Sequence, residues 1–300
     1  MISNGSERLG GVTQYRFRNN YMKTKRIILK EVILFLVITG VLTAGVFVWM
    51  FTSPKINVFM HMVLMWIPGI AALVTSLIQK DKIGAYGWRL GKFRFLGYAY
   101  ILPIATAFIA YGLVWISGFA DIFTDGVKNY RWARMIGLET PVPVWMGILS
   151  KASVAFLITL PFALGEEIGW SGFLTPKLSK ISSVTVTSVV VGVCWAAWHF
   201  PMIIRGVYGY GTPLWIALPG FTIVMIGGSF IRTVLTARSK SLWPGVILHT
   251  SHNTFLMGIF HDLTLQKGYA DYIVSETGLF TGIIYIAVAI LFWKSQTKSN

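Results

Sequence analysis

The run VILFLVITGVLTAGVFVWMF, residues 32–51, decides the class of fold to which this chain belongs. The run contains no charged residue. A helix rises about 1.5 Å per residue, so a run of this length can cross a hydrocarbon layer roughly 30 Å thick. Basic residues precede the run, and no small-residue cleavage site accompanies it, a pattern typical of an anchor that stays in the protein. We therefore expect the first transmembrane helix here.

The composition of the whole chain agrees with a membrane location. Of its 300 residues, 55% are hydrophobic and 12% are charged, with a mean hydropathy of +0.65, whereas about 25% of the residues of soluble domains are charged. Further apolar runs that could span a membrane occupy residues 59–78, 95–116, 152–174, 184–204, 214–231, 242–259 and 278–293. We predict an all-α, polytopic membrane protein with about eight transmembrane helices.

Lys and Arg are distributed unevenly among the segments between these runs. If the N-terminus is cytoplasmic, 19 of the 26 Lys and Arg residues fall on cytoplasmic segments, as the positive-inside rule requires. The same rule accounts for the net charge of +15 without a nucleic-acid partner. Because an even number of spans returns the C-terminus to the starting side, we predict an integral protein of a bacterial or archaeal plasma membrane with both termini cytoplasmic.

We predict one membrane domain with short ends. Residues 1–30 form a basic cytoplasmic arm, residues 31–294 the transmembrane domain, and residues 295–300 a cytoplasmic tail. The arm suits contact with an anionic membrane surface and a solvated tail equally well. No sequence repeat of the kind found in two-half transporters is apparent, which disfavours transport. The single cysteine, Cys194, excludes an intrachain disulfide.

Several polar residues lie inside the apolar runs, where ionisable groups are costly and usually mark function. They are Glu166, Glu167, His199, His249, His252 and Asn253. His249 and Asn253 are four residues apart and share one helix face, whereas His61 and His261 lie near the ends of runs and are predicted to be interfacial. Counting about 1.5 Å per residue permits one cavity at mid-depth, which we expect to open to the cytoplasm.

A carboxylate, two histidines and an amide in a dry cavity suit hydrolysis. One Glu with a His can activate water as a general base, and a His with an Asn can donate hydrogen bonds to an oxyanion. The same residue types also form hydrogen bonds between membrane helices, so a purely structural role stays open at this point.

Three motifs resemble those of the CAAX-protease and bacteriocin-processing family of intramembrane proteases, which includes the Ras-converting endopeptidase. They are EEIGWSGFL from Glu166, WAAWH ending at His199, and HTSHN from His249 to Asn253. The resemblance implies a family core at about residues 150–260 and an endopeptidase acting on a peptide or protein at the membrane, prenylated or otherwise lipid-modified substrates included. It implies that Glu166 and His199 activate water, with Glu167 beside them, and that His249 and Asn253 form the oxyanion hole. It implies no cofactor.

One position departs from the family pattern, because the Arg expected four residues after Glu167 is Ser171. Adjacent helical residues point about 100° apart, so a Glu166 that faces the cavity leaves Glu167 in need of another partner. We expect Glu167 to be protonated or paired with a distant cation such as Arg205 or Arg232. Since the missing group is supportive and does not react, we expect activity to survive.

Two other functions fit the same residues. A zinc protease would use Glu166, His199 and His249 as ligands with a water in the open position, although the sequence lacks a His-Glu-x-x-His helix. A non-catalytic immunity or scaffold protein would bind a peptide in the same cavity, and Ser171 favours this alternative. The leading prediction is the endopeptidase.

Overall fold

The computed structural model describes residues 6–122, 143–209, 211–266 and 270–298. Helices dominate these residues, and the strands found in them are one short antiparallel pair, β1 (Ala120–Ile122) and β2 (Thr264–Gln266). Of the described helices, seven are long and apolar enough to cross a membrane. The predicted all-α, polytopic class is therefore confirmed.

The spanning helices follow one another along the chain. They are α1 (Ser6–Thr52), α2 (Val58–Gln79), α3 (Phe93–Ile116), the continuous helix Val144–Ser179, α8 (Val184–Ile204), α9 (Leu214–Ser239) and the region Ala270–Gln296, which holds α11 (Ala270–Val274) and most of α12 (Leu279–Lys298). The eighth expected span, residues 242–259, is also helical, as α10 (Trp243–Ser251) and η4 (His252–Phe260). It is not among the seven, because its histidines and Asn253 lower its mean hydropathy.

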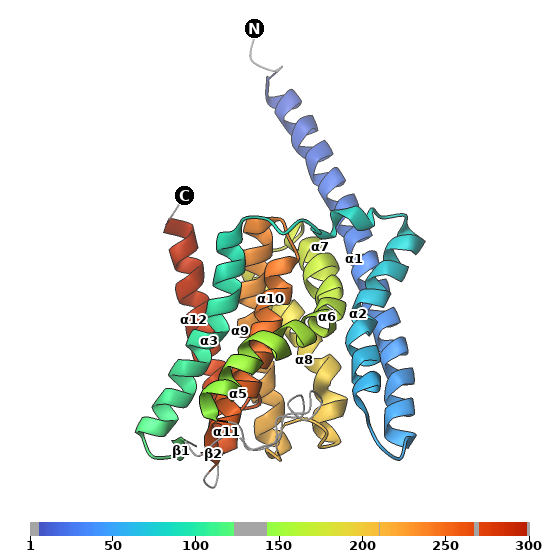
Figure 1. The fold of residues 1–300 in the computed structure, drawn as a ribbon. Coiled ribbons are helices and arrows are strands. Elements are labelled where there is room, and N and C mark those ends of the chain that lie inside the picture. The colour runs from blue at the N-terminus through green and yellow to red at the C-terminus, as the bar shows by residue number, and fades with distance from the viewer. Residues whose placement is uncertain (1–5, 123–142, 210, 267–269, 299–300) are drawn as a thin grey trace.

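Successive helices alternate in direction, and α10 with η4 takes part in this alternation (Figure 1). The chain consequently starts and ends at the same end of the helical body (Figure 1). We call this the terminal end, and the opposite end, where α1 connects to α2 and α8 to α9, the distal end. The arrangement agrees with an even number of crossings, and the side of the membrane that each end faces stays a prediction.

The helix that carries the glutamate pair changes its winding along its length. It consists of α5 (Val144–Ser150), η2 (Lys151–Ala155), α6 (Phe156–Glu167), η3 (Ile168–Leu174) and α7 (Thr175–Ser179). The segments η2 and η3 are π-helical, as is η4. Such wider turns are rare and frequent at functional sites. Here η3 begins directly after Glu167, and η4 begins at His252.

Two glycines let α2 approach this helix closely. A Cβ atom on Gly165 would lie 2.9 Å from the carbonyl oxygen of Met65, and one on Gly169 would lie 2.6 Å from that of Pro68. Small residues four apart allow membrane helices to pack backbone to backbone. Because Glu166 lies between the two glycines, the contact with α2 fixes the height and rotation of its carboxylate.

Replacement of Gly169 by Ala should lower the stability of the protein. The added methyl group would meet the backbone of α2, and overpacking of this kind costs about 1–3 kcal/mol. Gly97→Ala on α3 is the matched control, since a Cβ there has no neighbour within 4 Å. Thermal unfolding in detergent should show a lower Tm for Gly169→Ala alone, and equal Tm values would contradict the close contact.

Candidate functional site

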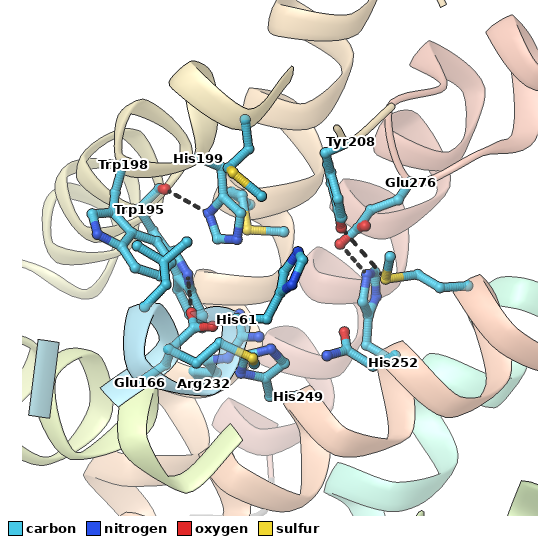
Figure 2. Close-up of a pocket in the computed structure, with 16 residues that line it drawn as sticks. His61, Glu166, Trp195, Trp198, His199, Tyr208, Arg232, His249, His252 and Glu276 are labelled. Carbon is cyan, nitrogen blue, oxygen red and sulfur yellow. Dashed lines mark hydrogen bonds and ion pairs between the residues drawn. The ribbon is translucent and has the colours of Figure 1, made fainter. Parts of the chain in front are cut away.

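A cavity of about 140 Å³ lies within the bundle and collects most of its buried polar side chains (Figure 2). By this measure about 10–15 Å³ accommodates one water, so the cavity can hold several. It is lined by His61, Leu64, Met65, Glu166, Trp195, Trp198, His199, Met202, Tyr208, Met225, Arg232, His249, His252, Asn253, Met257 and Glu276. Glu166, His199, His249 and Asn253, which lie on three separate helices, thus meet in one place.

Glu166 is held at the wall of this cavity by a tryptophan. Its side chain is almost fully buried, with 1% of its surface exposed, and Trp195 Nε1 donates a hydrogen bond of 2.8 Å to its Oε2 (Figure 2). Trp195 is fixed in turn by Trp170, whose ring stacks on it at 5.6 Å between centroids. The carboxylate therefore has a defined position before any ligand arrives.

Glu167 points away from the cavity and is completely buried. Its Oε1 lies 3.1 Å from Arg232 Nε and 3.2 Å from His249 Nδ1, and the Ser171 hydroxyl donates to its Oε2. The guanidinium of Arg232 also lies over the Trp195 ring, 4.1 Å from its centroid. One buried cluster thus joins residues of four helices: the glutamate-bearing helix, α8, α9 and α10.

This cluster shows which distant cation partners Glu167. Of the two arginines considered from the sequence, Arg232 on α9 reaches the carboxylate, whereas Arg205 lies over the ring of Phe51. The charge that the family pattern leads us to expect at position 171 is supplied here from another helix.

Position 171 has room only for a small side chain because α10 packs closely against it. A Cβ atom on Gly245 would lie 2.7 Å from Glu167 Oε2 and would also meet the Ser171 hydroxyl. An arginine at position 171 would have to displace α10, because the interior of a protein has little spare volume. Ser171 and Gly245 together let α10 carry His249 up to Glu167.

His199 and His249, the two histidines that are candidates for catalysis, each have one ring nitrogen close to a partner atom. His199 Nδ1 lies 3.1 Å from the carbonyl oxygen of Trp195 (Figure 2), and because a carbonyl only accepts, Nδ1 is the donor. In a neutral ring, Nε2 then carries the lone pair and can accept a proton. His249 turns its Nδ1 toward Glu167, which leaves its Nε2 as the nitrogen available for a ligand.

Sequence reasoning overlooked a further carboxylate of the cavity. Glu276 lies just before the last apolar run of the sequence, yet only 4% of its surface is exposed and it lines the cavity. Its Oε1 lies 2.8 Å from His252 Nε2, and His252 Nδ1 lies 2.8 Å from the Tyr285 hydroxyl (Figure 2). The burial results from this contact between η4 and the turn that precedes α12, segments far enough apart in the chain that no local pattern reveals it.

The two histidines that were predicted to be interfacial, His61 and His261, differ in their relation to the cavity. His61 lies in the first turn of α2, close to the end of that helix as predicted, and it also lines the cavity. His261 does not line the cavity, and its Nε2 lies 3.3 Å from Asp271. Trp195 and Arg232 are the other members of the site whose roles required the tertiary structure.

The side of the membrane to which the cavity opens stays a prediction. Three of its half-buried lining residues, His61, Tyr208 and Met257, lie near the distal end, in the first turn of α2, just after α8 and in the second half of η4. The helices are continuous through the site, and only their tilt and stagger decide where the gap between them lies.

The proposed zinc ligands do not fit a metal centre in this arrangement. Within the described ranges, no three His, Cys, Asp or Glu side chains gather so that they could hold a metal ion. Trp195 holds Glu166 Oε2, a backbone carbonyl holds His199 Nδ1 and Glu167 holds His249 Nδ1. A zinc ion with three protein ligands and a water would require the remaining ring nitrogens and carboxylate oxygen to converge on one point.

The fold and the cavity define a class: an all-α, polytopic membrane protein with buried carboxylates and histidines around an internal cavity. Within this class, residues 148–255 match the family described as type II CAAX prenyl endopeptidase Rce1-like. The matched residues contain all three motifs, so the resemblance predicted from those motifs is confirmed over this part of the chain.

A curated relative agrees with this assignment. The chain is similar to CAAX prenyl protease 2 of Methanococcus maripaludis, with 28% identity over 147 residues, which is 48% of this chain and 50% of that protein. The chain thus spans about half the length of the curated relative that it matches.

Arg232→Gln should destabilise the protein by about 3–5 kcal/mol, because it leaves the Glu167 carboxylate buried without a cation. The double variant Arg232→Gln/Glu167→Gln removes both charges and should be much less destabilised than the sum of the two single variants. Chemical or thermal unfolding of the four proteins measures this coupling. Additive effects would show that the two side chains do not interact.

Proposed function

We propose that this protein is an intramembrane endopeptidase that hydrolyses a peptide bond of a membrane-associated peptide or protein. The observation that carries the proposal is the convergence of Glu166, His199, His249 and Asn253 on one buried cavity that can hold water. The family match over residues 148–255 supports it.

Water activation falls to Glu166 and His199. The carboxylate of Glu166, held by Trp195, takes a proton from the attacking water, and His199 accepts a second hydrogen bond from that water through Nε2. The hydroxide equivalent adds to the carbonyl carbon of the peptide bond and forms a tetrahedral intermediate. Proton transfer from Glu166 to the amide nitrogen then lets the C–N bond break, and Glu166 returns to its starting state.

His249 and Asn253 stabilise the oxygen that becomes negative in this step. A proton on His249 Nε2 and the side-chain amide of Asn253, one helical turn away, donate to it. Such donors act strongly in a site from which water is largely excluded. Glu167 is a positioning residue, because its carboxylate lies 3.2 Å from His249 Nδ1 and orients the ring.

The substrate class follows from the apolar walls and from the relative. Trp198, Met202, Met225 and Met257 line the cavity beside the polar groups, and methionines adapt to apolar ligands of varied shape. The archaeal relative is named a CAAX prenyl protease. A lipid-modified or membrane-embedded peptide is therefore the substrate that we propose.

Glu166→Gln should reduce peptide-bond cleavage by about 10²- to 10⁴-fold, the usual contribution of a general base, and should leave the fold intact. Glu31→Gln, at a carboxylate that pairs with Lys177 outside the cavity, is the matched control. Mass spectrometry of peptides released from membranes that contain the parent or either variant measures the effect. Undiminished biological activity of a folded Glu166→Gln protein would sink the enzyme proposal and favour a peptide-binding immunity or scaffold protein.

We further propose that catalysis needs no metal cofactor, since the carboxylate and histidine roles above complete the reaction. The substrate is one identified from the peptides that the parent protein releases from membranes. Purified protein treated with excess EDTA should cleave it at an unchanged rate. Loss of activity that zinc restores, with no loss when EDTA is presaturated with zinc, would overturn this and require the three side chains to rearrange around an ion.

A further inference from the structure

Glu276 lies on the cavity wall but has no part in the hydrolysis proposed above. It belongs to the turn between α11 and α12, and 4% of its surface is exposed. Its Oε1 lies 2.8 Å from His252 Nε2, whereas its Oε2 is buried and has no hydrogen-bond partner in the described parts of the chain. A buried polar atom without a partner costs free energy. This oxygen is therefore a candidate for contact with a ligand.

The turn that carries Glu276 is packed tightly against the bundle. The backbone N–H of Thr277 donates to Ser275 Oγ over 3.2 Å, and the Thr277 hydroxyl donates to the carbonyl oxygen of Gly209 over 3.4 Å. Gly220 of α9 packs directly on the turn, since a Cβ atom there would clash with the carbonyl oxygen of Thr277. The backbone thus holds the Glu276 side chain at one place on the wall.

His252 orients the carboxylate and occupies only one of its oxygens. The Tyr285 hydroxyl lies 2.8 Å from His252 Nδ1. A neutral ring satisfies both contacts, because the hydroxyl can donate to Nδ1 while Nε2–H donates to Glu276 Oε1. His252 directly precedes Asn253 in η4, so Glu276 is anchored to the same helical turn as a proposed oxyanion donor. A group bound by Glu276 would therefore lie close to the peptide bond that is cleaved.

Carboxylates outnumber Lys and Arg side chains on the cavity wall. Glu166 and Glu276 line the cavity from opposite sides in the view of Figure 2. Among the described lining residues, Arg232 is the only Lys or Arg, and its Nε lies 3.1 Å from Glu167, whose carboxylate compensates its charge. A carboxylate removed from water is stabilised by a cation and hydrogen bonds. A positively charged group in the cavity would supply both to Glu276.

We propose that Glu276 is a specificity-determining residue that binds a positively charged group of the substrate, the ammonium or guanidinium of a Lys or Arg side chain near the cleaved bond. The free Oε2 accepts the hydrogen bond of this group, and the apolar walls of the cavity accommodate its alkyl stem. The inference rests on the proposed peptidase function and refines it, because it adds a basic residue to the membrane-associated peptide.

The cleavage sites test this preference. Peptides released from membranes that contain the parent, Glu166→Gln, Glu276→Gln or Glu31→Gln are sequenced by mass spectrometry. We expect Lys or Arg at one fixed position near the cleaved bond in the peptides that the parent releases and Glu166→Gln does not. Glu31→Gln, at a carboxylate outside the cavity, should keep this preference, and Glu276→Gln should lose it. Parent sites without a basic residue, or a preference unchanged in Glu276→Gln, overturn the proposal.

A pair of synthetic substrates gives a measurement that needs no folded Glu276 variant. In one released peptide, the basic residue is replaced by norleucine, which has an uncharged alkyl side chain. The parent should cleave this peptide with a kcat/KM roughly 10- to 100-fold lower, since a hydrogen bond to a charged group is lost. Equal kcat/KM values would contradict the proposal. Glu276→Gln should cleave both peptides at similar rates, an outcome that a merely structural role of Glu276 would not produce.

Ligand binding separates this proposal from the peptidase function, because it needs no cleavage. Hexylammonium and hexanol share one alkyl chain and differ in charge. Hexylammonium should raise the Tm of the parent and of Glu166→Gln in detergent more than hexanol does, and this difference should vanish for Glu276→Gln. If the parent cleaves nothing and the difference is present, the peptidase function fails and the cation site stands. Equal Tm shifts of the parent with the two compounds overturn the cation site, whatever the cleavage assay shows.

Discussion

The buried contact between Glu167 and Arg232 is the constraint on which the rest of the site depends. A carboxylate without access to water is costly unless a cation and hydrogen-bond donors compensate it. Arg232 Nε at 3.1 Å and the Ser171 hydroxyl fulfil this requirement. Because the two charges lie on different helices, their pairing fixes how the glutamate-bearing helix packs against α9, and a small Gly245 lets α10 join them.

The groups proposed to react are built upon this contact. Trp195 links this contact to the proposed base: its ring packs on the guanidinium of Arg232, and its indole N–H holds Glu166. Glu167 likewise reaches His249. A perturbation of the ion pair would thus shift the proposed base and one proposed oxyanion donor together. The two adjacent glutamates therefore have separate roles. Glu166 faces the cavity and is the proposed base, whereas Glu167 points into the bundle and joins the helices.

Although position 171 is not an arginine, a cation from another helix reaches Glu167. The charge comes from α9, and the matched family segment, residues 148–255, includes its source, Arg232. Serine is also smaller than arginine, and α10 packs closely into the space that Ser171 leaves. The missing residue is therefore weaker support for a non-catalytic protein than it is in the sequence alone.

Hydropathy and helical periodicity by themselves determined the membrane class, the positions of the spans and the polar residues worth attention, because these depend on neighbours along one helix. Glu166, His199, His249 and Asn253 were identifiable in this way. Only the tertiary structure decided that Arg232 and not Arg205 meets Glu167, that Glu276 is buried against His252, and that the half-buried lining residues lie distally. Those outcomes depend on the rotation, tilt and stagger of helices far apart in the chain, which local sequence patterns do not encode.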